Sequence, residues 1–99
     1  MENLFAYGTL IFPDKQQELF GRTLDGKDDV LNNYTKNTII IDGEVYPCVD
    51  ESEGENAHGV VYQVTSEELL LADEYEGKEY KRIKTILESC TDAWVYVRT

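Results

Sequence analysis

Asn3-Leu4-Phe5-Ala6-Tyr7-Gly8-Thr9-Leu10 begins as an apolar, aromatic run and then meets a glycine. Aromatic residues in an unbroken apolar run favour a pleated strand, and Gly8 interrupts that pattern. We therefore predict a first strand over residues 3–7, followed by a sharp turn at Gly8 and Thr9.

Two helices are predicted from their end signals. Residues 13–20 form the first, because proline suits the first helical turn and Gly21 is a natural stop. Thr65 and Glu68 have the spacing of a capping box, so the second helix should begin there. It should end near Gly77, since glycine commonly ends a helix.

Further strands are predicted where β-branched and aromatic residues gather, over residues 30–41 (as one or two strands), 58–64, 80–87 and 93–97. The polar stretch 22–29 contains a turn signal, and Asp42-Gly43 is a stronger one. Acidic residues 50–56 predict a solvated, irregular loop, opened by Tyr46-Pro47, a step that raises the chance of a cis peptide bond. These elements predict an α+β fold, a small mixed β-barrel or sheet with short helices packed outside, as one domain over residues 1–99.

Composition limits the partners. Nine Lys and Arg stand against twenty Asp and Glu, giving a formal charge of −11. Nucleic acid and anionic membrane surfaces would be repelled by that field, whereas small molecules carrying an amine would not. A chain of 99 residues has a thin core, so a homodimer is a further expectation.

Apolar runs are only a few residues long, against the roughly 20 that a membrane span needs. The N-terminus lacks the basic and apolar regions of a signal peptide, which leads us to expect a cytoplasmic protein. Cys48 and Cys90 are expected to be reduced thiols, and they lack the spacing of a metal site.

The motifs, read together, are Tyr7-Gly8-Thr9-Leu10, Tyr46-Pro47, Gly59-Val60-Val61-Tyr62, Asp73-Glu74-Tyr75-Glu76-Gly77 and Tyr80 with Arg82. In kind and order they resemble the γ-glutamylcyclotransferase-like (AIG2-like) family, with a pattern closest to its γ-glutamylamine cyclotransferases. The resemblance covers residues 5–97 and departs at Ala72, where the family often has leucine.

The resemblance implies an internal cyclisation. The α-amine of a γ-glutamyl group attacks its own γ-carbonyl, which closes 5-oxoproline and expels an amine. Such a reaction needs no cofactor, no metal and no protein nucleophile. Glu76 is the candidate general acid and base, provided that burial raises its pKa. Without the family pattern, Glu76 would be one of twenty acids, on a solvated helix face.

Substrate binding is expected at the turn. Backbone N–H groups leaving a strand suit an anion, so Gly8, Thr9 and Leu10 are expected to cradle the substrate α-carboxylate. Tyr7 should pack beneath the turn with its hydroxyl available, and Tyr80 should bond the substrate or position Glu76. By pattern alone, Gly8 would be only a strand-exit turn.

Two alternatives stay open at this stage. The domain could bind a small molecule without turnover, or it could act on a different γ-glutamyl compound. The acidic surface favours a cationic leaving amine, such as a lysine side chain or a polyamine, over an anionic one. Arg82 is expected to pair with Asp73 as scaffolding, and His58, the only histidine, is expected to have no catalytic role.

Overall fold

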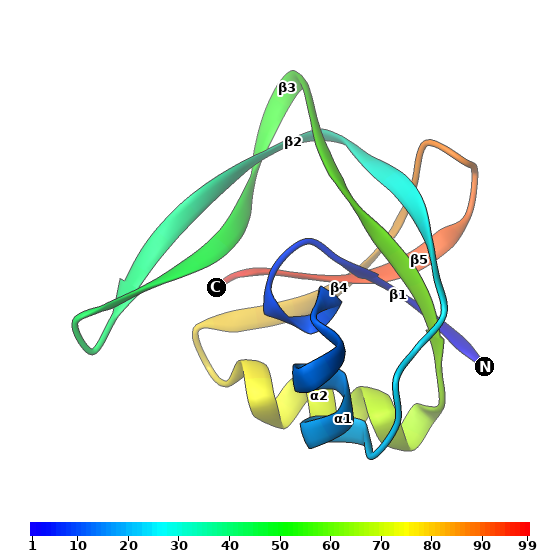
Figure 1. Ribbon diagram of the computed structural model, residues 1–99. Coiled ribbons are helices and arrows are strands. Elements are labelled where there is room, and N and C mark those ends of the chain that lie inside the picture. The colour runs from blue at the N-terminus through cyan, green and yellow to red at the C-terminus, as the bar shows by residue number, and fades with distance from the viewer.

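One mixed sheet and two α-helices make up the computed structural model, which describes residues 1–99 (Figure 1). The elements in chain order are β1 (Glu2–Ala6), the 3-10 helix η1 (Thr9–Ile11), α1 (Pro13–Phe20), β2 (Gly26–Ile41), β3 (Glu44–Val64), α2 (Ser66–Glu76), β4 (Tyr80–Ile86) and β5 (Asp92–Arg98). The strand order is β2-β3-β1-β5-β4, in which β1 and β5 are parallel and the other neighbours antiparallel. The predicted α+β class is confirmed, with the sheet curled into a half-barrel.

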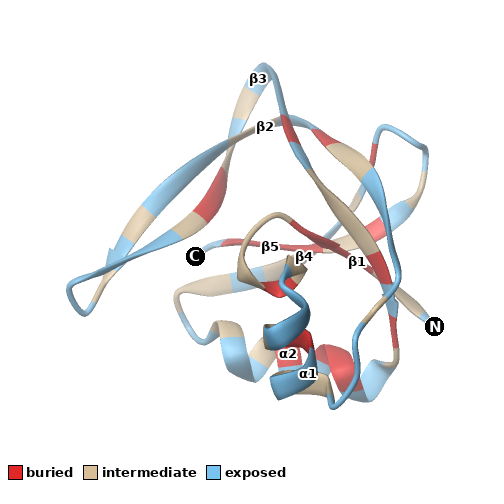
Figure 2. Ribbon diagram, viewed as in Figure 1, coloured by how far each residue is buried: buried red, intermediate tan, exposed pale blue.

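β1 is the central strand and is buried on both faces. Leu4 and Ala6 join the cluster beneath the helices, whereas Phe5 joins a second cluster on the opposite side of the sheet. β5 alternates in the same way, with Tyr96 on the helix side and Val95 on the other. Figure 2 shows buried residues along these two strands and on α2, with further ones on β2 and β3. The helices therefore pack outside a sheet that is filled from both faces.

Both helices begin and end where the sequence predicts. The Oγ1 of Thr65 accepts a hydrogen bond from the N–H of Glu68 at 3.1 Å, and Glu68 Oε1 accepts one from the N–H of Thr65 at 2.9 Å. This reciprocal pair is the predicted capping box. Gly21 ends α1 with a φ of 74°, a conformation that glycine adopts without steric cost. Neither helix is long and apolar enough to cross a membrane.

The predicted acidic loop over residues 50–56 is wrong, because these residues belong to β3. β3 pairs with β2 from Gly26↔Tyr62 to Ile41↔Glu44, with one irregularity near Asn33. Most of the acidic side chains lie at exposed positions of this long hairpin, so the backbone pairs while the charges stay in water. The predicted break within residues 22–29 is also replaced by strand, since β2 already begins at Gly26.

The β2–β3 hairpin extends beyond the rest of the sheet as a curved arm (Figure 1). Its tip is the predicted Asp42-Gly43 turn, whose residues have φ values of 51° and 83°. Two successive positive φ values match the twist of an antiparallel hairpin. The Tyr46-Pro47 bond at the base of the tip is trans, as are all peptide bonds in the chain.

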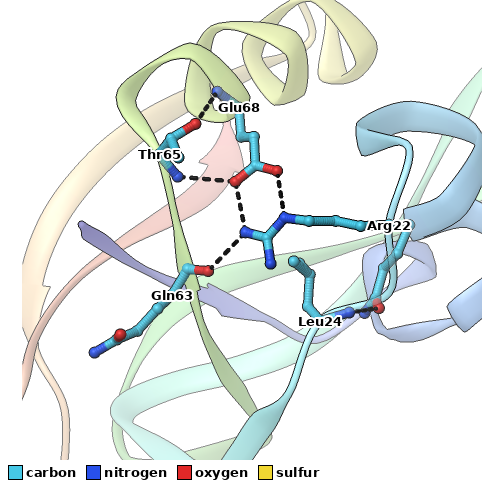
Figure 3. A network of polar contacts seen from close by, with 6 residues as sticks. Arg22, Leu24, Gln63, Thr65 and Glu68 are labelled. Carbon is cyan, nitrogen blue, oxygen red and sulfur yellow. Dashed lines mark hydrogen bonds and ion pairs between the residues drawn. The ribbon is translucent and has the colours of Figure 1, made fainter.

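An ion pair ties the loop after α1 to the start of α2 (Figure 3). Arg22 Nε and Nη2 donate to the two carboxylate oxygens of Glu68, both at 2.8 Å. Nη2 also reaches the carbonyl of Gln63 at 3.4 Å. The pKa of Glu68 is lowered, chiefly by the hydrogen bond from Arg22. Stability from this pair is therefore present above the ordinary carboxyl pKa of 4.5 and is lost as the pH falls below it.

Replacing Arg22 tests this contact. Arg22→Leu leaves the mostly buried Glu68 carboxylate without its bidentate partner, so the free energy of unfolding at pH 7 should fall by about 1 to 3 kcal/mol. Urea denaturation measures the change. The more exposed pair of Arg98 and Asp50 supplies a control, because Arg98→Leu should cost less than about 1 kcal/mol. Equal losses in the two variants would contradict a special role for the Arg22 contact.

Candidate active site

A cavity of about 600 Å³ lies where the turn after β1, the base of the hairpin arm and the end of α2 meet. Its lining includes every site residue predicted from the sequence, namely Tyr7, Gly8, Thr9, Leu10, Glu76 and Tyr80. These residues come from three segments of the chain, and the first and the last of them are more than sixty positions apart in the sequence. The fold therefore brings the predicted set together in one place.

The turn after β1 leaves three backbone N–H groups without an acceptor. Within η1 and its cap, the N–H of Ile11 donates to Gly8 at 3.3 Å and that of Phe12 donates to Thr9 at 3.1 Å. The N–H groups of Gly8, Thr9 and Leu10 donate none of the hydrogen bonds in the structure. Consecutive N–H groups without an acceptor in a turn can bind an anion.

Gly8 is required by close packing. A Cβ built on Gly8 would lie 2.8 Å from the Cγ of Pro47, a distance that forces one of them to move. Pro47 is itself held in place, because the Tyr80 hydroxyl donates to its carbonyl oxygen at 2.6 Å. The φ of Gly8 is −125°, so space rather than backbone conformation selects the glycine. The hairpin arm thus packs directly against the turn, through Pro47 and Gly8.

Glu76 is the last residue of α2 and lines the cavity. Burial raises the pKa of its carboxyl from the ordinary value of 4.5 to about 7. Gly77 then ends the helix with φ 76° and ψ −168°, a backbone region that essentially only glycine adopts. The Asp-x-x-Glu-Gly motif therefore places a carboxyl group in the cavity at the point where the helix must stop.

Tyrosines line the cavity together with this carboxyl group, and the hydroxyls of the two that the sequence predicts are already engaged. Tyr7 donates to the carbonyl of Tyr96 at 2.6 Å, and Tyr80 donates to Pro47. Burial, followed by the Glu76 charge, raises the pKa of Tyr7 and raises that of Tyr80 to about 12. The expectation that the Tyr7 hydroxyl is available needs correction, because its proton is donated to the protein backbone.

Asp73 and Arg82 are scaffolding, as expected. Asp73 Oδ1 lies 3.2 Å from Arg82 Nε and accepts the Tyr96 hydroxyl at 2.7 Å. Arg82 also stacks over the Trp94 ring, 4.4 Å from its centroid. These contacts fasten the last turn of α2 to β4 and β5, and so fix the position of Glu76.

Tyr75 joins α2 to the turn from the other side. Its hydroxyl lies 3.0 Å from Thr9 Oγ1 in a hydrogen bond, and Lys15 Nζ lies 5.8 Å from the centre of its ring. Behind the turn, the buried amide of Gln16 donates to the carbonyl of Leu10 at 2.8 Å. The turn is therefore held by α1 and α2 as well as by the hairpin arm.

A family model described as gamma-glutamyl cyclotransferase, AIG2-like, matches residues 4–99. The chain belongs to this family. The resemblance predicted from the motifs is thereby confirmed. Among relatives within the family, AIG2-like protein A of Arabidopsis thaliana is 34% identical over 84 residues, which cover 84% of this chain and 50% of the relative. AIG2-like protein D of the same plant is 28% identical and covers 100% of this chain and 66% of the relative.

Solved structures show the family's fold. The solution structure of an Arabidopsis thaliana protein superposes with a TM-score of 0.84 at 27% identity, covering 98% of this chain and 61% of that one. A structure of a gamma-glutamyl cyclotransferase superposes with a TM-score of 0.77 at 17% identity, over 99% and 66% of the two chains, which shows a shared fold. The chain spans about half the length of several curated relatives that it matches.

Sequence reasoning missed several lining residues of this family member. Lys15, Glu44, Tyr46, Glu79 and Tyr96 all line the cavity. The Tyr46-Pro47 step was noted as the start of a loop and as part of the family pattern, but not as part of the site. No local signal marks the others, because their place depends on how α1, the hairpin arm and β5 pack.

Two further expectations concern metals and histidine. No group of three or more His, Cys, Asp or Glu side chains is arranged to hold a metal ion. His58 does not line this cavity, and it lies instead at a more open hollow beside Asp28 and Asp29. The cavity itself offers backbone N–H groups and the half-buried Glu76 carboxyl as its chemical features.

The raised pKa of Glu76 predicts a stability change. Between pH 4.5 and 7 the unfolded chain ionises Glu76 while the native protein keeps it neutral, so the free energy of unfolding falls as the pH rises. Glu76→Gln removes this penalty. The variant should exceed the parent in stability at pH 8.5 by up to about 3 kcal/mol, with a smaller gain at pH 5, measured by urea denaturation. Glu74→Gln, on the exposed face of the same helix, is the control, and an equal gain there would refute the explanation.

Proposed function

We propose that this protein releases 5-oxoproline and a free amine from a γ-glutamyl amine or peptide. One observation carries the proposal. A half-buried carboxyl group, whose pKa is raised to about 7, shares a cavity with three backbone N–H groups that have no acceptor. Family membership supports the same reaction, and because the chain spans only part of its relatives, the activity of the whole protein is included in the proposal.

Substrate binding comes first in the mechanism. The N–H groups of Gly8, Thr9 and Leu10 receive the α-carboxylate of the glutamyl group. Tyr7 and Tyr80 line the space where its carbon chain folds back on itself. The attack is already intramolecular, so holding the α-amine against the γ-carbonyl contributes by restricting the rotations of the glutamyl chain, which is less than the ~7 to 11 kcal/mol that positioning gives a bimolecular reaction.

Proton transfer follows. Glu76, as a carboxylate, takes a proton from the α-ammonium, and the freed nitrogen attacks the γ-carbonyl carbon. In the tetrahedral intermediate, the protonated Glu76 gives this proton to the leaving nitrogen, and the bond to that nitrogen breaks as the carbonyl re-forms. The carboxylate that results takes a second proton from the ring nitrogen and passes it to the released amine. A pKa near 7 suits a group that must both take and give a proton at neutral pH.

Replacing Glu76 tests the reaction. Glu76→Gln should lower the rate of 5-oxoproline release by at least about 100-fold, because general acid–base catalysis is lost. For the parent, kcat/KM should rise with pH through about 7, as the Glu76 carboxyl loses its proton. Chromatographic measurement of 5-oxoproline gives both results. Glu74→Gln should keep the parental rate, and full turnover by Glu76→Gln would remove Glu76 from the mechanism.

A cationic leaving amine is favoured by the charges of the cavity. Glu44 and Glu79 line it together with Glu76, while Lys15 is its single basic residue. Carboxylates stabilise an alkylammonium group and repel an anion. We therefore infer that the preferred leaving group is an amine with a second positive charge and no net negative charge.

Two matched substrates test this preference. γ-Glutamyl-5-aminopentylamine and γ-glutamylhexylamine have the same length and differ in a terminal ammonium or methyl group. The cationic substrate should have a higher kcat/KM by about tenfold, and the Glu44→Gln, Glu79→Gln double variant should remove most of that difference. Equal use of the two substrates by the parent would overturn the preference and leave the reaction untouched.

The alternative is a domain that binds without turnover. It predicts that 5-oxoproline or glutamate raises the Tm while no γ-glutamyl amine or peptide releases 5-oxoproline. The same substrate panel therefore separates the two functions.

A further inference from the structure

Lys15 is the only basic residue that lines the cavity. The other charged residues there are Glu44, Glu76 and Glu79, and the whole chain carries a formal charge of −11. An anionic substrate group entering this cavity meets carboxylates on several sides. Neutral N–H groups offset that repulsion only in part. A cation within the cavity would offset the rest and so strengthen the binding of an anionic group.

The position of Lys15 links it to the anion cradle. Its Nζ lies 5.8 Å from the centre of the Tyr75 ring, and the Tyr75 hydroxyl is hydrogen-bonded to Thr9 Oγ1 at 3.0 Å. Thr9 is the middle residue of the three that have free N–H groups. Lys15 therefore lines the same cavity as the cradle and is linked to Thr9 through the side chain of Tyr75.

Its present partner holds it weakly. Lys15 Nζ lies 3.3 Å from Glu18 Oε2, three residues along the same helix, and the two side chains are 36% and 72% exposed. Exposed pairs of this spacing contribute little, because water screens them and two flexible side chains must be ordered. Lys15 can exchange Glu18 for a ligand in the cavity at small cost.

We propose that the Lys15 ammonium pairs with the α-carboxylate of the glutamyl moiety and completes the anion site begun by Gly8, Thr9 and Leu10. This inference rests on the proposed function and adds to it a residue that selects for the carboxylate. Lys15 takes no part in moving protons. Its loss should raise KM and leave kcat nearly unchanged, since the pair forms equally in the ground state and the transition state.

Binding of the product provides a test that does not depend on turnover. Calorimetry would compare 5-oxoproline with 2-pyrrolidinone, the same ring without its carboxylate. Lys15→Met should weaken 5-oxoproline binding by about tenfold and leave 2-pyrrolidinone binding unchanged. Lys15→Arg should keep most of the affinity. Lys27→Met is the matched control, because it removes the same charge from an exposed site outside the cavity.

Each outcome bears on one proposal. Equal 5-oxoproline affinity in the parent and Lys15→Met, or an equal loss in Lys27→Met, would overturn the role of Lys15 even if the parent releases 5-oxoproline. Loss confined to substrates whose leaving group carries a carboxylate would overturn it too, by placing Lys15 at the leaving group. Absence of 5-oxoproline release by the parent would defeat the proposed function, while the binding comparison would still decide whether Lys15 recognises the carboxylate.

Discussion

The short strand β1 is the constraint on which the site depends, because it is paired on both edges. Its residues pair antiparallel with β3, from Glu2↔Val64 to Ala6↔Val60, and parallel with β5 at Leu4↔Trp94 and Phe5↔Val95. A strand that is paired on both edges and packed on both faces cannot shift its register without breaking both ladders and moving every side chain into the opposite core cluster. The turn that follows it is therefore delivered to a fixed point, between the hairpin arm and the end of α2.

Local signals predicted the elements whose causes are local. The capping pair of Thr65 and Glu68 and the stop at Gly77 act within one or two turns of helix, and the structure has them as expected. The acidic half of β3 could not be predicted this way. Its strand conformation comes from pairing with β2, which supplies backbone hydrogen bonds whatever the side chains are. The run of acidic residues indicates that those side chains lie in water, but it does not indicate the conformation of their backbone.

The residues of the candidate site also divide into those that local sequence signals predict and those that only tertiary packing brings to the cavity. Glu76 and the Gly8 turn were predictable, because a family pattern records them as short motifs. Tyr46, Tyr96 and Lys15 come from the hairpin arm, β5 and α1, and only the packing of those elements on β1 brings them to the cavity. The function of Gly8 illustrates the difference. Sequence reasoning assigned Gly8 to the substrate cradle, whereas the structure adds that a Cβ at Gly8 would come within 2.8 Å of the Pro47 ring.

Glu76 links the stability of the fold to its chemistry. Its surroundings withhold water from the carboxyl, and this one cause both raises the pKa and makes the ionised native state less stable. The Arg82–Asp73–Tyr96 contacts hold the end of α2 in place in spite of that penalty. A more solvated Glu76 would make a more stable protein with a weaker base. The position of Glu76 therefore lowers the stability of the ionised protein, and the proton transfer that we propose for this residue would account for that cost.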